Sequence, residues 1–140
     1  MKAIALSIVV LAFVATNAHA TDRLALTCKG TSGPIDRREP REPFSIGVII
    51  NFTDKTVHGF EAGGLWFRSK NKPAKIADIS ETEIYFEAKS QRFGLEHHII
   101  GTLDRVTGDM EISSTDWKGD QPAGDGTMYE LKCRPTQRMF

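Results

Sequence analysis

The chain has 140 residues, in which 18 lysine and arginine side chains balance 18 aspartate and glutamate side chains, and it has only two cysteines. One domain is the default at this length, and 40% hydrophobic with 26% charged residues is ordinary for a globular protein, so wholesale disorder is not expected. The formal net charge of zero argues against nucleic-acid binding, and two cysteines are too few for a small disulfide scaffold or a four-cysteine zinc site.

The first 20 residues have the features of a secretory signal peptide. Lys2 supplies a positive charge, residues 3–15 form an apolar stretch, and a small-x-small cleavage site ends at Ala20. The apolar stretch is shorter than the roughly 20 residues that a transmembrane helix needs. We therefore expect cleavage after Ala20, a single β domain over residues 21–140, and a periplasmic or secreted protein without stable membrane insertion. Loss of Lys2 from the 18 basic side chains leaves 17 against 18 acidic ones, a net charge of −1.

The two cysteines, Cys28 and Cys133, predict one structural disulfide. Export would place both in an oxidising compartment, and their spacing is not the C-x-x-C of a redox pair. The bridge would close a loop of roughly 100 residues, for which chain entropy predicts about 4–5 kcal/mol of stabilisation. It would also tie the first strand of the domain to the last.

Period-two alternation of apolar residues predicts short strands along the whole domain. His97 shares the predicted inward face of its strand with Ile99 and Leu103, and the turn at residues 105–108 places a glycine where a left-handed conformation is needed. An aromatic run at residues 65–67 interrupts the pattern. The expected strands, in chain order, cover residues 23–29, 44–52, 56–60, 75–79, 83–89, 95–103, 109–115 and 127–133.

These strands predict an all-β fold, because no window shows a sustained 3.6-residue apolar repeat. Sequential hairpins favour an antiparallel meander of eight or nine strands. A disulfide between the end strands favours a closed barrel, which leaves no exposed sheet edge. A two-sheet β-sandwich is the alternative.

Three places carry candidate contact residues. The inward His97 is either hydrogen-bonded to a neighbour or a polar group in a ligand cavity. The loop at residues 61–74 combines aromatic and basic side chains, either as a patch for an anionic ligand or protein partner or as solvated charges at a barrel end. Trp117 begins an acidic loop at residues 116–126, as a contact or an end plug. The candidate ligand or partner residues are Trp66, Phe67, Arg68, Lys70, Lys72, His97 and Trp117.

Motifs of catalysis and metal binding are missing from the sequence. There is no nucleophile elbow, phosphate-binding glycine loop, calcium loop or dinucleotide fingerprint. His97 and His98 are adjacent in a strand and face opposite sides, so they cannot bind one metal together. We therefore predict no catalytic residue, metal or cofactor, although a catalytic triad is spatial and needs no sequence motif.

Two segments carry a resemblance to known proteins. The closing strand Tyr-x-Leu-x-Cys-x-Pro at residues 129–135 and the segment Gly-Thr-Leu-Asp-Arg-Val-Thr-Gly at residues 101–108 resemble small exported proteins of unknown function from proteobacteria. This resemblance implies export and the disulfide, and no activity. The early cysteine and the β-rich size are also similar to those of periplasmic inhibitors of C-type lysozyme, whose Ser- and Lys-bearing inhibitory motif is not found here.

The function expected first is that of an exported, non-catalytic binding protein. Its ligand is either a small apolar molecule inside the barrel, in a pocket lined by residues such as Phe44, Ile46, Phe86 and Ile99, or an envelope protein held by the loops. The alternative is an inhibitor of a secreted or periplasmic hydrolase. The third possibility is an unrecognised enzyme, which would require His97 or His58 in a cluster with carboxylates.

Overall fold

The computed structural model describes residues 22–36, 39–59 and 73–136, which form antiparallel β-sheet with no helix among them. Most strands are longer than the sequence alternation predicted, because the pairing continues beyond the predicted ends, whereas the strand predicted from residue 56 ends at His58. Their bounds are β1 (Arg23–Pro34), β2 (Glu42–Asn51), β3 (Thr56–His58), β4 (Ala74–Ile79), β5 (Glu83–Arg92), β6 (Leu95–Asp104), β7 (Asp109–Lys118), β8 (Gln121–Pro122) and β9 (Thr127–Pro135).

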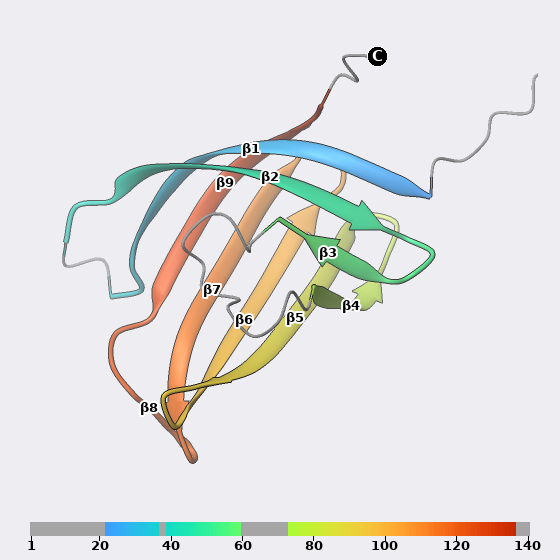
Figure 1. The fold of residues 1–140 in the computed structure, drawn as a ribbon. Helices are drawn as coiled ribbons and strands as arrows, with labels where there is room; N and C mark the ends of the chain where they lie inside the picture. The colour runs from blue at the N-terminus through green and yellow to red at the C-terminus, as the bar shows by residue number, and fades with distance from the viewer. Residues whose placement is uncertain (1–21, 37–38, 60–72, 137–140) are drawn as a thin grey trace, which may run out of the picture.

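The sheet closes into a barrel (Figure 1). Strands β1 to β7 pair in chain order, β7 pairs with β9, and β9 returns to β1. The two-residue β8 pairs with the end of β7 and lies outside the ring of eight. The predicted antiparallel barrel is therefore confirmed, and the sandwich alternative is not adopted.

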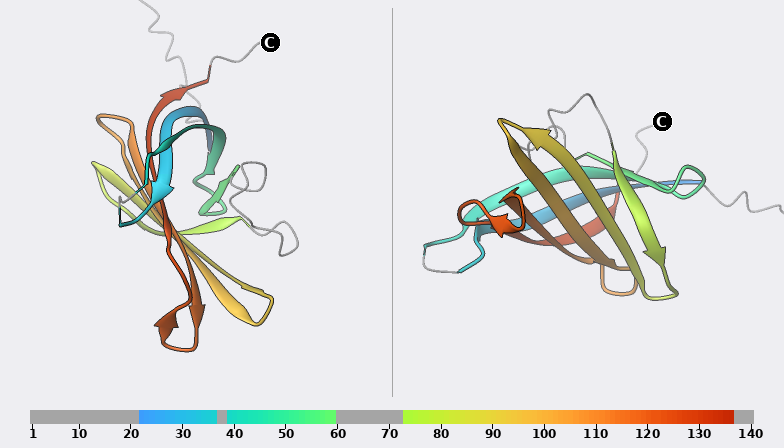
Figure 2. Two further views of the ribbon diagram at one scale, coloured as in Figure 1. Left: turned by 90° about the vertical axis from the view of Figure 1, so that its left-hand side faces the viewer. Right: turned by 90° about the horizontal axis from the view of Figure 1, so that it is seen from below.

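The barrel has two different ends. At one end, which we call the disulfide end, residues 105–108 turn from β6 into β7 beside Cys133, whose N–H donates to the carbonyl of Gly108 at 2.7 Å. At the other, which we call the hairpin end, the β5–β6 hairpin turns at Phe93 and Gly94, and the β7–β8 hairpin turns at residues 119–120. Figure 2 shows these two hairpins extending from the same end of the molecule.

The core confirms the predicted alternation. Phe86 on β5 lies over Gly101 on β6, where a Cβ atom would come within 2.2 Å of the phenyl ring. Gly101 is therefore the residue that lets Phe86, the largest fully buried side chain, lie across the sheet. The buried apolar residues are Leu26, Cys28, Ile46, Val48, Ile50, Val57, Ala74, Ile76, Ile84, Phe86, Ile99, Leu103, Met110, Ile112, Tyr129, Leu131 and Cys133.

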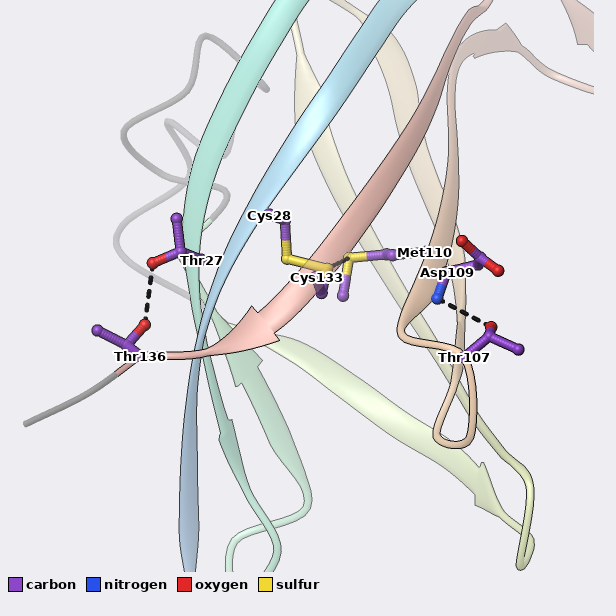
Figure 3. Close-up of a disulfide and its surroundings, with 7 residues drawn as sticks. All are labelled: Thr27, Cys28, Thr107, Asp109, Met110, Cys133 and Thr136. Atoms are coloured by element: carbon purple, nitrogen blue, oxygen red, sulfur yellow. Dashed lines mark hydrogen bonds between the residues drawn. A yellow bond between two sulfur atoms is a disulfide. The ribbon is translucent and has the colours of Figure 1, made fainter.

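The predicted disulfide is present between β1 and β9. Cys28 and Cys133 are directly opposite in the antiparallel register, and both are buried. Figure 3 shows the bridge beside Met110 of β7, whose Sδ lies 3.9 Å from Cys133 Sγ. The bond thus joins the first and last strands of the ring, as the spacing of the cysteines predicted. Among the described residues, none belongs to a helix long and apolar enough to cross a membrane.

Candidate functional site

Most of the predicted basic and aromatic cluster lies outside the described residues. Trp66, Phe67, Arg68, Lys70 and Lys72 all fall within residues 60–72. The predicted role of this loop therefore stays a prediction. The remaining candidates, His97 and Trp117, both lie at the hairpin end.

His97 is buried on the inward face of β6, as its strand parity predicted, and both of its ring nitrogens are engaged. Nδ1 lies 2.6 Å from Asp116 Oδ1, and Nε2 lies 3.2 Å from Ser114 Oγ. Since a carboxylate only accepts hydrogen bonds, Nδ1 carries a proton and donates a hydrogen bond to Asp116. In the neutral ring Nε2 then accepts from the Ser114 hydroxyl.

The register of β6 and β7 assembles this group. His97 stands directly opposite Asp116, and Ser114 precedes Asp116 by two residues and so shares its inward face. The sequence indicated His97 as inward but missed both partners. The turn at residues 105–108 places Leu103 opposite Met110. Continuing this pairing along both strands places His97 opposite Asp116, so the position of the turn was enough to predict the contact.

The inner wall of the barrel becomes polar at this level. Ser90 on β5 is opposite His97, and Thr127 on β9 is opposite Ser114, so four adjacent strands present polar side chains. Nearer the disulfide end the same inward rows carry Ile99, Leu103, Met110 and Ile112, which are almost completely buried. Buried polar groups are costly unless they are hydrogen-bonded, and His97 satisfies this condition through its two partners.

Trp117 lies in β7 and not in a loop, which corrects the sequence prediction. Pairing with β6 continues to Trp117, opposite Glu96, because Asp116 is held in the strand by its contact with His97. The indole faces outward, half-buried against the ring of His98 with 5.7 Å between centroids. His98 Nε2 bonds to Glu96, so the Trp117 ring is held on the outer wall beside a small polar network.

Phe93 is a residue that the sequence reasoning missed. It lies at the tip of the β5–β6 hairpin with 90% of its surface exposed. Its φ is +49° and that of Gly94 is +78°, so both turn residues have the left-handed conformation typical of a tight hairpin. Such a turn favours asparagine or glycine in the first position, and a phenylalanine there costs on the order of 1 kcal/mol. The signal in the sequence was a glycine between two alternating segments.

The described side chains at the centre of the barrel are closely packed. The exposed fractions of Ile46, Phe86 and Ile99 are 6%, 1% and 0%. A cavity large enough for a ligand would give its wall residues exposed surface, so these side chains pack against one another. One hollow of about 710 Å³ lies on the outside of β1 and β2. Another of about 250 Å³ opens at the disulfide end and is lined in part by the core residues Leu26, Ile84 and Leu103.

Charged groups at the disulfide end are held in place by the turn. Backbone N–H groups of Thr107 and Val106 donate to Asp104 and lower the pKa of its carboxyl group. A hydrogen bond from Lys132 Nζ, at 2.8 Å, lowers the pKa of Asp109. Both carboxylates therefore belong to a stable turn.

Comparisons with protein-family models, with curated proteins and with solved structures found no match for the chain.

Proposed function

We propose that the protein is an exported binding protein that contacts a partner protein of the cell envelope through its hairpin end. The observation that supports this most is Phe93, a large apolar side chain with 90% of its surface exposed in a backbone conformation that phenylalanine rarely adopts. Its exposed ring offers a large apolar surface to another molecule, and its left-handed backbone conformation is one that costs stability.

The surroundings of Phe93 fit a protein partner. Trp117 lies on the outer wall at the same end, and aromatic residues are enriched where protein interfaces are most deeply buried. Charged side chains of both signs lie near Trp117. Glu96 is its partner on β6 and lies 4.0 Å from Lys89, and Lys118 follows Trp117 in the chain. The expected partner therefore offers an apolar pocket for one aromatic ring, bordered by polar groups.

Close packing of the described residues at the barrel centre favours this surface over the interior as the binding site. Of the residues expected to line an internal ligand pocket, Ile46, Phe86 and Ile99 are in close packing. Export is supported by the buried disulfide, since such bonds persist in oxidising compartments, together with the predicted signal peptide.

Native mass spectrometry of the protein purified from its own host tests the proposal. We expect the wild-type protein to retain a protein partner, Phe93→Asn to lose it, and Val106→Asn to keep it. Val106 is the matched control because it is also exposed, at 76%, but belongs to the turn at the disulfide end. Retention of the partner by Phe93→Asn, or its loss from Val106→Asn alone, would contradict the proposed contact surface.

A hydrolase inhibitor is the second candidate, and the projecting hairpins favour it. A convex hairpin on a disulfide-closed barrel is suited to enter a concave active-site cleft with little loss of conformational entropy. A panel of secreted glycosidases and proteases should then include an enzyme that the wild-type protein inhibits and Phe93→Asn does not. Equal inhibition by both proteins would exclude Phe93 from that role.

A further inference from the structure

The group around His97 has the arrangement of a nucleophile, a base and an orienting acid. Asp116 accepts from Nδ1 at 2.6 Å, which leaves Nε2 as the acceptor for the Ser114 hydroxyl at 3.2 Å. This order, with the carboxylate on Nδ1 and the serine on Nε2, is the one in which histidine removes a proton from an attacking serine. We infer that Ser114 is the nucleophile of an acyl-transfer site that accepts small carboxylic esters.

Solvent reaches this group from the hairpin end. The Asp116 side chain is 43% exposed and Ser114 is half-buried, whereas the imidazole between them is almost fully enclosed. The strand partner of Ser114, Thr127, lines a hollow of about 240 Å³ together with Gly126 and Pro34. Because the imidazole beside Ser114 is almost fully enclosed, we expect a short acyl chain to reach the serine more easily than a long one.

The reaction proceeds in two balanced steps. Ser114 Oγ bonds to the carbonyl carbon of the ester while its proton passes to His97 Nε2. The carbon–oxygen bond to the alcohol then breaks, and the alcohol leaves with that proton. Water next attacks the acyl-serine, with His97 as the base, and releases the carboxylic acid. Asp116 does not touch the substrate and acts as a positioning residue, because its bond to Nδ1 holds the ring in the required tautomer.

This inference is independent of the proposed partner contact. It differs from the expectation that the chain has no catalytic residue. The strand register brings His97, Ser114 and Asp116 together, and no sequence motif links these three residues. The two ideas can fail separately, since Phe93→Asn leaves the three side chains untouched.

A matched pair of serine variants tests the inference. Ser113 and Ser114 are adjacent in β7, and alternation turns Ser113 to the outer wall. We expect a fluorophosphonate to add one covalent label, mapped to Ser114, in the wild-type protein and in Ser113→Ala, and none in Ser114→Ala. Hydrolysis of p-nitrophenyl acetate should fall by about 100-fold or more in Ser114→Ala, because the attacking oxygen is lost, and stay unchanged in Ser113→Ala.

The role of Asp116 has a separate signature. Asp116→Asn should shift the pH dependence of p-nitrophenyl acetate hydrolysis while thermal unfolding shows that the protein is still folded. The inference is overturned if the wild-type protein takes no label, if the label maps to a residue other than Ser114, or if Ser114→Ala hydrolyses the ester as fast as the wild-type protein.

Discussion

The two turns that bound β6 both reverse the chain with left-handed residues, but they use different residues in that conformation. At the disulfide end Gly108, with a φ of +77°, takes the left-handed position, and the Asp104 carboxylate accepts from Val106 and Thr107 at 2.8 Å each. At the hairpin end the left-handed position before Gly94 is taken by Phe93, which is 90% exposed. One turn has the residues that stabilise a hairpin, and the other has a residue that weakens it.

The difference extends into the barrel. Beside the stable turn the inward residues are apolar and the disulfide joins β1 to β9. Beside the strained turn the inner wall carries His97, Ser114 and Asp116. Departures from local stability rules are expected at functional positions. The residues of the disulfide end therefore favour stability, and those of the hairpin end support it as the proposed contact surface.

The largest expected effect on stability comes from the disulfide. Replacement of both Cys28 and Cys133 by serine should lower the free energy of unfolding by about 4–5 kcal/mol, because a cross-link between residues 105 apart restricts the unfolded chain strongly. Urea denaturation under oxidising conditions measures the loss, and a reducing agent should produce it in the wild-type protein but not in the double variant. An unchanged midpoint would contradict the assignment of stability to this end.

A smaller effect is expected from the crossing of Phe86 over Gly101. Gly101→Ala should lower the free energy of unfolding by about 1–3 kcal/mol, since the added methyl group would meet the phenyl ring and overpack the core. Gly47→Ala is the control, because nothing lies within 4 Å of the corresponding Cβ position. Equal thermal denaturation midpoints for the two variants would show that the ring moves aside at no cost.

A stabilising substitution is expected at the hairpin tip. Phe93→Asn should raise the free energy of unfolding by about 1 kcal/mol, because asparagine tolerates the left-handed conformation that phenylalanine resists. Val106→Asn, in the other exposed turn, should change it little. A loss of stability in Phe93→Asn would mean that the phenylalanine supports the fold.

The smallest effect concerns acid stability. The native pKa of Asp104 is lowered by its two backbone donors, so the ionised carboxylate stabilises the fold above the pKa of the unfolded chain. This contribution is lost as the pH falls through the native pKa. Asp104→Asn should therefore be less stable at neutral pH and show a flatter decline in acid, measured by urea denaturation between pH 2 and pH 7. A decline as steep as that of the wild-type protein would exclude Asp104 as a source of acid sensitivity.

Local alternation was sufficient to predict much of this molecule. It identified the inward rows that contain Leu26, Val48, Ile99 and Leu131, and the cysteine spacing indicated which strands close the barrel. Both signals are properties of neighbouring residues or of a single covalent constraint. Alternation and the cysteine spacing therefore predict the fold even when the pairing of strands that are not joined by a hairpin is unknown.

The features that escaped prediction depend on register. The bulge between Ile76 and Asp78 places Ile79 opposite the buried Ile84, whereas unbroken alternation from Ile76 would turn Ile79 to the other face of the sheet. Trp117 was assigned to a loop because Asp116 favours turns, whereas its contact with His97 keeps the strand extended. Alternation alone does not single out Ser114 or Phe93, because the position of each depends on how β6 pairs with its two neighbours.

Site-specific cross-linking in the host tests most directly whether the hairpin end is the contact surface. A photoreactive benzoylphenylalanine is placed at position 93 in one variant and at position 106 in another, so that each exposed turn carries the same probe. If the hairpin end is the contact surface, we expect a discrete adduct with a protein partner from position 93 and none from position 106. An adduct from position 106 alone, or none from either position, would contradict it.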